Sequence, residues 1–246
     1  MKFIVTEDYE AMSRTAARVI SGYVSSHPDC VLGLATGSTP IGLYRCLVED
    51  YEAGALSFKD VTSFNLDEYR GLDPQHDQSY RYFMEHNLFS HVDIDPARTH
   101  VPDGACPDAA AACAAYEQSI AEAGGLGLQL LGLGHNGHIG FNEPAPEFPK
   151  ETHCVELTES TINANARFFE KKEDVPTMAI TMGMGDILAA KKVVLAATGL
   201  AKVPAIKGLI MDDVITTQNP STMLKMHEDA VVVIDRELAD AVGYRA

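Results

Sequence analysis

Residues 31–48 read VLGLATGSTPIGLYRCLV and show how the chain is organised. Residues 31–35 are apolar without polar alternation, which is typical of a strand buried on both faces. Pro40 favours the first turn of a helix, and a hydroxyl just before it favours the helix N-cap. A helix then continues to residue 48. The stretch therefore predicts a buried strand, a tight turn and a helix.

The same alternation of short apolar runs and helical patterns continues through all 246 residues. Further helices are predicted near residues 9–24, 80–89 and 109–122, and further strands at 3–5, 61–65, 128–133, 178–181, 193–197 and 231–234. There is no internal repeat and no linker. We therefore expect one α/β domain over residues 1–246, with a doubly wound, mostly parallel, Rossmann-like sheet and helices on both faces.

Charge and cysteine content exclude several classes of function. The formal net charge is −16, which disfavours binding to nucleic acid or to anionic membranes. The N-terminus does not resemble a signal peptide, and no apolar run is long enough to span a bilayer. The five cysteines have irregular spacing, which favours reduced thiols and a cytoplasmic protein.

Unusual residues cluster directly after four of the predicted strands. These stretches are TGSTP (36–40), NLDEY (65–69), GHNGHIGFNEP (134–144) and ATGLAK (197–202). Ligands of doubly wound sheets bind outside the carboxyl ends of the strands. We therefore expect these stretches to meet at one site.

The TGSTP turn is equally compatible with a helix cap and with a phosphate cradle. A cradle would use free backbone N–H groups, the positive end of the helix dipole and the hydroxyls. The spacing of a Walker P-loop or of a dinucleotide-binding loop is absent. Two cations near ligand-side loops would complete a phosphate clamp. The candidate phosphate-binding residues are Thr36, Gly37, Ser38, Thr39, Arg167 and Lys202.

Two adjacent acids, Asp67 and Glu68, follow the strand predicted at 61–65. Adjacent acids at a strand end usually form a solvated turn, and spacing alone favours that interpretation. Phe64 and Tyr69 flank the pair and would exclude water from it. A carboxylate at this edge could instead act as a base toward a carbon-bound proton.

The GHNGHIGFNEP loop allows three interpretations. His135, His138 and Glu143 would form a metal site, although this loop lacks the rigid helix of an H-E-x-x-H motif. The histidines could instead be solvated parts of a structural loop. In the third interpretation a histidine is a general acid and base, oriented by a carboxylate and an amide.

Five blocks of the chain together resemble the glucosamine-6-phosphate deaminase family. They are LATGSTPIGLY, SFNLDEYRGL, SYRYFMEHNLF, LGLGHNGHIGFNEP and AITMGMGDILAAKKVVLAATGLAK, in this order. The resemblance implies that Asp67 moves a proton between C2 and C1, supported by Glu68. It implies that His138, held by Glu143, opens the sugar ring. Many members have an aspartate where this chain has Asn136, which orients an imidazole but lends it no charge.

The resemblance also implies an activity in amino sugar catabolism. Glucosamine 6-phosphate and water would become fructose 6-phosphate and ammonium, without a cofactor. Residues 159–176 would form a lid over the sugar. The sequence is equally compatible with an ordinary surface helix in this segment. The alternatives are a 6-phosphogluconolactonase-like hydrolase and a non-catalytic sugar-phosphate sensor. A sensor would usually carry a DNA-binding module, for which this chain has no spare length.

The loop at residues 145–155 bears on regulation. Some longer members of the family are hexamers activated by N-acetylglucosamine 6-phosphate. They bind the activator phosphate with hydroxyl and basic residues shortly after the NEP motif. Here Pro146 and Pro149 have no N–H to donate, and Glu147 and Glu151 would repel a phosphate. We expect a monomer or small oligomer without an allosteric activator.

Overall fold

The centre of the molecule is a seven-stranded sheet in which every neighbouring pair of strands is parallel. The computed structural model describes residues 1–245, apart from the side chain of residue 168. The strands lie in the order β1 (Lys2–Thr6), β10 (Ala230–Asp235), β9 (Lys192–Ala197), β6 (Leu128–Leu131), β2 (Val31–Leu34), β3 (Thr62–Asn65) and β5 (Thr99–His100). The predicted doubly wound sheet is confirmed.

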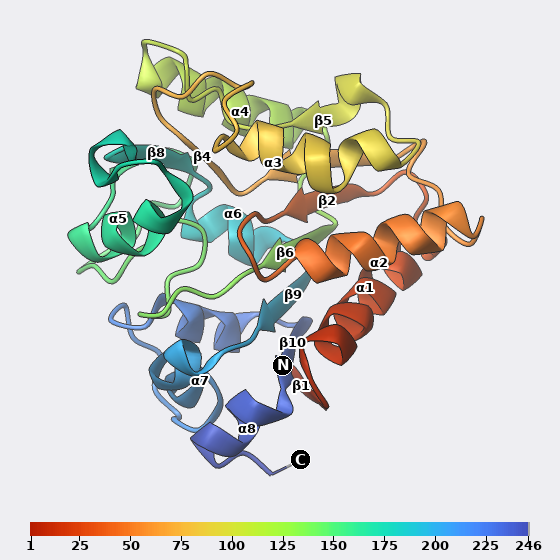
Figure 1. Ribbon diagram of the computed structural model, residues 1–246, viewed down its shortest axis with the longest axis vertical. Helices are drawn as coiled ribbons and strands as arrows, with labels where there is room; N and C mark the ends of the chain where they lie inside the picture. The colour runs from red at the N-terminus through yellow and green to blue at the C-terminus, as the bar shows by residue number, and fades with distance from the viewer. Residues whose placement is uncertain (246) are drawn as a thin grey trace.

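Helices cover both faces of this sheet (Figure 1). They are α1 (Tyr9–Ser26), α2 (Ile41–Glu52), α3 (Tyr80–Asn87), α4 (Ala109–Glu122), α5 (Glu159–Asn165), α6 (Met184–Ala189), α7 (Val203–Ile210) and α8 (Arg236–Val242). Parallel crossovers are right-handed. Helices α1 and α2, which advance the chain toward β5, therefore lie on one face. Helices α4, α6 and α7, which advance it toward β1, lie on the other.

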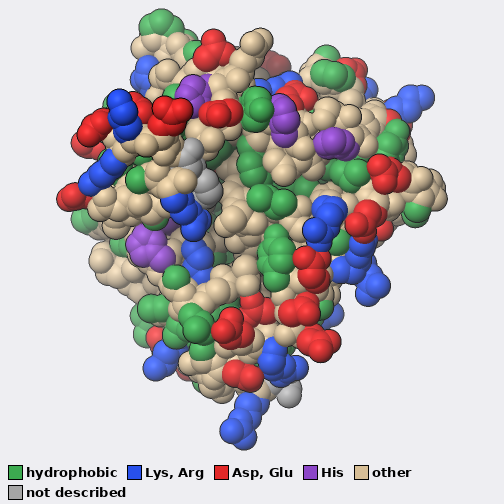
Figure 2. Space-filling view, in the orientation of Figure 1, with side chains coloured by type: hydrophobic (Ala, Val, Ile, Leu, Met, Phe, Trp, Pro, Cys, Tyr) green, Lys and Arg blue, Asp and Glu red, His purple; other side chains and the backbone are tan. Residues whose placement is uncertain are grey.

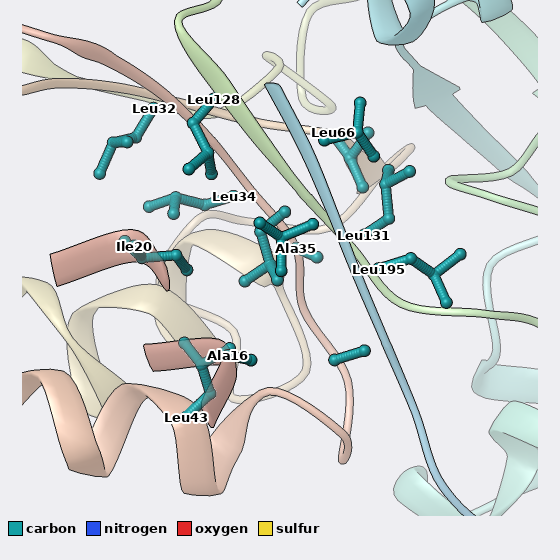
Figure 3. Packing of buried hydrophobic residues seen from close by; sticks show 14 of the residues in the cluster. Ala16, Ile20, Leu32, Leu34, Ala35, Leu43, Leu66, Leu128, Leu131 and Leu195 are labelled. Atoms are coloured by element: carbon teal, nitrogen blue, oxygen red, sulfur yellow. The ribbon is translucent and has the colours of Figure 1, made fainter. Parts of the chain in front are cut away.

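Apolar residues spaced four apart pack α1 against the sheet. Met12, Ala16, Ile20 and Val24 are buried, so they form one stripe along the helix. Asp8 caps the helix by accepting a hydrogen bond from the N–H of Ala11 (2.8 Å). Figure 3 shows Ala16 and Ile20 beside Leu43 of α2, facing leucines of β2 and β6. This packing holds the β2–α2 turn against the end of the sheet.

A second, antiparallel sheet lies beside the first and was not predicted. It consists of β4 (Asp67–Tyr69), β8 (Met178–Thr181) and β7 (His153–Glu156), with β8 in the middle. Residues 178–181 were expected in the parallel sheet, because the run MAIT shows no alternation of apolar and polar residues. Such a run shows that a strand is buried but not which sheet it joins. Strand β4 was also not predicted, because its two adjacent acids, Asp67 and Glu68, favoured a solvated turn.

Several local details also differ from the prediction. Helix α2 has Pro40 as its N-cap without a side-chain capping bond, so Thr39 is not the cap. Helix α3 ends at Asn87, and a 3₁₀ turn at Phe89–His91 follows. The segment 159–176 contains α5 and two 3₁₀ turns, η3 (Ala166–Phe168) and η4 (Lys172–Asp174). In residues 1–245 no helix is long and apolar enough to cross a bilayer.

Candidate active site

The site is a cavity outside the carboxyl ends of β2 and β6. These strands are neighbours, but the chain leaves β2 toward β5 and leaves β6 toward β1, so their loops diverge. This is the switch point at which doubly wound sheets bind ligands. The cavity is lined by residues of the β2–α2 turn, the 134–144 loop, β4, α5 and the segment after β9. Basic side chains gather between α5 and α7 on this side of the molecule (Figure 2).

One end of the cavity is suited to an anion. Thr36, Gly37, Ser38 and Thr39 all line it. In the described part of the chain, the N–H groups of residues 37–39 donate to no other protein group. Unpaired N–H groups before a helix form a phosphate-binding geometry. The structure thus brings all four residues of the predicted cradle together.

The hydroxyl of Tyr9 supports the turn of residues 36–39. This contact was not predicted from the sequence. Its hydroxyl lies 3.3 Å from the carbonyl oxygen of Ser38 and 3.1 Å from that of Thr39, and it accepts the N–H of Gly42 (2.9 Å). Tyr9 is the first residue of α1, 29 positions before Ser38. Only the packing of α1 on α2 brings them together, so no local signal marks this residue.

Two cations also line this cavity. Arg167 in η3 and Lys202, which closes the 3₁₀ turn η5 (Leu200–Lys202), both line it. Burial, and then the nearby charge of Arg167, lower the pKa of the Lys202 ammonium. Two neighbouring cations repel each other, and an anion bound between them would relieve that repulsion.

His138, Asn136 and Glu143 form one hydrogen-bonded network. Asn136 Nδ2 donates to Glu143 Oε2 (2.6 Å), and Asn136 Oδ1 lies 2.8 Å from His138 Nδ1. Glu143 Oε2 is also 3.4 Å from His138 Nδ1. Burial alone would raise the pKa of Glu143. Hydrogen bonds from His138, Thr161 and Asn136, with the charge of His138, outweigh it and lower that pKa to about 2.

This network determines the tautomer of His138. An ionised Glu143 only accepts hydrogen bonds, so the amide nitrogen of Asn136 must face it. The amide oxygen then faces His138 Nδ1, which must carry a hydrogen. In the neutral imidazole Nε2 is therefore the basic nitrogen, and His138 lines the cavity. Asn136 orients the ring without adding a second carboxylate beside Glu143.

Two glycines allow the loop to take this shape. A Cβ on Gly134 would lie 2.3 Å from the His138 ring, so only glycine lets the ring pack on the backbone. Gly140 has φ +58° and would place a Cβ 2.8 Å from Thr181 Oγ1. The loop can therefore pack closely against β8 and place His138 in the cavity that Asp67 of β4 also lines.

Asp67 is buried, not solvated as the spacing of the acids favoured. It pairs with Thr181 across β4 and β8, is 7% exposed and lines the cavity. Burial, and then the charge of Glu68, raise the pKa of Asp67 to about 8. Such a carboxyl can both accept and return a proton near neutral pH.

Glu68 faces away from this site. Its carboxylate accepts the backbone N–H groups of Tyr69 (2.8 Å), Tyr80 (3.0 Å) and Arg81 (3.0 Å), and it is not among the residues that line the cavity. It therefore binds the N-terminus of α3, where the helix dipole favours a negative charge.

Within residues 1–245 no three His, Cys, Asp or Glu side chains are grouped to bind a metal ion.

Several other residues that line or shape the cavity were not singled out in the sequence. Thr161 and Asn165 line it from α5, and Tyr80 lines it from α3. The one local signal is at Thr158, an N-cap hydroxyl that accepts the N–H of Thr161 (3.3 Å). A helix start could have been placed there, but its contact with Glu143 depends on the tertiary structure.

Comparison with known proteins agrees with this geometry. Residues 6–233 match the family described as glucosamine-6-phosphate isomerases/6-phosphogluconolactonase. The chain belongs to this family. Within the family, it is 50% identical over 242 residues to the glucosamine-6-phosphate deaminase of Thermoanaerobacter sp. (strain X514), covering 98% of this chain and 95% of that protein. It is 50% identical over 243 residues to the corresponding enzyme of Clostridioides difficile (strain 630), covering 99% and 97%.

Solved structures of this family extend the comparison. A structure described as a monomeric glucosamine-6-phosphate deaminase matches with a TM-score of 0.95 and 42% identity, covering 98% of this chain and 100% of that one. A 6-phosphogluconolactonase from Thermotoga maritima matches with a TM-score of 0.76 but 19% identity, covering 96% and 99%. The second likeness concerns the fold alone.

Proposed function

We propose that the protein is a glucosamine-6-phosphate deaminase, which converts glucosamine 6-phosphate and water to fructose 6-phosphate and ammonium. The observation that carries this proposal is the buried carboxyl of Asp67 in the same cavity as His138 and the anion-binding turn. A lactone hydrolase would need the phosphate clamp and a histidine but no acid for proton transfer at carbon. The relatives at 50% identity support the same choice.

The phosphate of the substrate binds at the turn of residues 36–39. The free N–H groups and hydroxyls of this turn surround it from one side, and Arg167 and Lys202 contribute positive charge from the other. The protein's net charge of −16 repels an anion, so these local groups are what attract the phosphate.

His138 opens the sugar ring. Its Nε2 takes the proton of the C1 hydroxyl and returns a proton to the ring oxygen, which leaves an open-chain aldehyde. Asn136 and Glu143 hold Nδ1–H during both steps and stabilise the positive charge that forms on the ring. Because Glu143 stays ionised, this stabilisation is present throughout.

Asp67 then transfers a proton between two carbons. It removes the proton from C2 while the aldehyde oxygen takes up a proton released by the substrate ammonium, which gives a neutral enolamine. The same carboxyl then returns its proton to C1. The product is an iminium at C2. Water adds to that carbon, and ammonium leaves, so that fructose 6-phosphate and ammonium balance glucosamine 6-phosphate and water. A pKa of about 8 suits a group that acts first as base and then as acid.

The test is a product assay with purified protein. Fructose 6-phosphate and ammonium should form in equal amounts from glucosamine 6-phosphate. Hydrolysis of 6-phosphogluconolactone is measured in parallel. Lactone hydrolysis without release of ammonium would reject the proposal in favour of the hydrolase, and binding without either reaction would favour the sensor.

A further inference from the structure

The carboxylate of Glu143 is held by two different parts of the chain. Oε2 is bound by Asn136 and His138 of the glycine-rich loop. Oε1 accepts hydrogen bonds from the hydroxyls of Thr161, in the first turn of α5, and of Thr158, the N-cap of that helix (3.3 Å). Thr161 is 3% exposed and Glu143 is 7% exposed, so these bonds are shielded from water.

The same hydroxyls also build the start of α5. Thr158 Oγ1 accepts the N–H of Thr161 (3.3 Å) and lies 3.2 Å from Thr161 Oγ1. The hydroxyl that caps the helix and the neighbouring hydroxyl of Thr161 therefore both bind Glu143. Helix α5 cannot occupy this position without presenting Thr161 to the carboxylate.

The other end of this segment reaches the rest of the site. Asn165 Nδ2 donates to the hydroxyl of Tyr69 (2.7 Å), two residues after Asp67 on β4. Arg167 follows in η3 and lines the same cavity as the 36–39 turn. Residues 158–167 thus connect Glu143, β4 and the phosphate site.

We infer that Thr161 is a positioning residue through which the α5 segment couples phosphate binding to the orientation of Glu143 and His138. This inference rests on the proposed function for its kinetic consequences. It extends the lid expected at residues 159–176 by making the segment a support for the ring-opening group, not only a cover.

The coupling has a physical cause. If α5 moves away, Oε1 of Glu143 remains buried without its hydroxyl donors, and a buried charged group without partners is costly. The carboxylate would then turn toward other donors and loosen its hold on His138. A phosphate that draws Arg167 inward favours the docked helix, so the two contacts reinforce each other.

The experiment compares Thr161→Val, which removes the hydroxyl at constant shape, with Thr161→Ser, which keeps it. We expect kcat to fall about 10- to 100-fold in Thr161→Val, as expected for loss of a hydrogen bond to a charged group. Thr161→Ser should keep most of the wild-type kcat. Asn163→Ala, an exposed position of the same helix, is the control and should behave as wild type. Thermal melts establish that each variant is folded.

Two further measurements do not require the deaminase reaction. The NMR signal of the His138 ring should change in Thr161→Val but not in Thr161→Ser. Inorganic phosphate, titrated by calorimetry, should bind several-fold more weakly to Thr161→Val, and this loss should disappear in an Arg167→Ala background. An unchanged His138 signal, or equal phosphate loss in both backgrounds, would overturn the coupling. Absence of deamination by the wild type would reject the proposed function and leave these two measurements decisive.

Discussion

Asp67 illustrates how the fold changes the chemistry of a single residue. An exposed aspartate is almost fully ionised at neutral pH, whereas burial and the neighbouring Glu68 raise the pKa of Asp67 to about 8. This carboxyl must be ionised to remove the C2 proton. Its titration should therefore be visible in the kinetics.

We predict that kcat/KM increases with pH up to a limit near pH 8, where Asp67 of the free enzyme loses its proton. In the complex, the cationic amine of the substrate favours the ionised carboxylate and lowers the pKa of Asp67. The rise of kcat with pH should therefore occur at a lower pH than the rise of kcat/KM. Rate measurements from pH 5 to pH 10 test this. A kcat/KM that stays constant between pH 6 and pH 9 would contradict the assigned role.

Replacement of the same residue should affect stability as well as turnover. The folded-state pKa is raised, so the unfolded chain releases the Asp67 proton near pH 4 and the folded protein near pH 8. The contribution of Asp67 to the free energy of unfolding therefore falls between these values by about 1.4 kcal/mol per pH unit and then levels off. Asp67→Asn should abolish deamination and C2 proton exchange but melt higher than wild type, with a difference that grows from pH 4 to pH 8. Glu228→Gln, at an exposed position, should show no such trend.

Asn136 should matter for the rate more than for binding. Asn136→Leu keeps the size of the side chain but removes the acceptor for His138 and the donor to Glu143. Loss of bonds to charged groups should lower kcat by about 10- to 100-fold with little change in KM, because the phosphate cradle lies elsewhere. Asn136→Asp keeps the acceptor and should retain more activity. Equal losses in the two variants would show that orientation of the ring is not the role of this residue.

At the scale of elements, the β2–α2 turn depends on a hydroxyl from another helix. Tyr9→Phe removes the contacts to Ser38, Thr39 and Gly42 and should let the turn relax. We expect KM to rise about 3- to 10-fold, corresponding to roughly 0.5–1.5 kcal/mol, with kcat nearly unchanged. The control is Tyr51→Phe, in the last turn of α2. A fall in kcat at constant KM would indicate that Tyr9 supports the chemistry instead.

The segment after β9 should contribute to phosphate affinity. Lys202→Ala removes one cation from the lining of the cavity and should weaken substrate binding by about 1.5–3 kcal/mol. Inhibition by glucosamine, which lacks the phosphate, provides the comparison. Glucosamine should bind both proteins equally; a matching loss for glucosamine would remove Lys202 from the phosphate clamp.

At the scale of the whole molecule, the 145–155 loop is already engaged within the chain. The carbonyl oxygens of Pro149 and Lys150 accept the N–H groups of Met184 (3.2 Å) and Gly185 (2.9 Å) at the start of α6. Glu117 accepts the N–H of Thr152 (2.9 Å). These bonds direct carbonyl oxygens inward and use a backbone donor that a phosphate would need.

We therefore predict hyperbolic saturation by glucosamine 6-phosphate, unchanged by N-acetylglucosamine 6-phosphate, in a monomer or small oligomer. Saturation curves with and without the acetylated sugar, together with sedimentation, test both parts. Sigmoidal curves that become hyperbolic when the acetylated sugar is added would show that this loop has been misinterpreted.

The residue pattern was sufficient to predict the main parallel sheet and the clustering of most candidate site residues at one edge of it. Strands buried on both faces carry apolar runs such as residues 31–34 and 193–197, and the loops after them contain glycines and polar groups that a packed core does not require. Because parallel strands place their carboxyl ends at one edge, TGSTP, His138 and Lys202 could be expected to meet. The resemblance to a known family assigned roles to them.

Tertiary structure alone decided which groups complete the site. The β4–β8 pairing buries Asp67, while the adjacent Glu68 turns to the N-terminus of α3, although the two acids look equivalent in the sequence. Tyr9 and Thr161 reach the site by helix packing and by the docking of α5. Local patterns report the burial and shape of a segment. They do not report its partners, because those contacts join residues far apart in the chain.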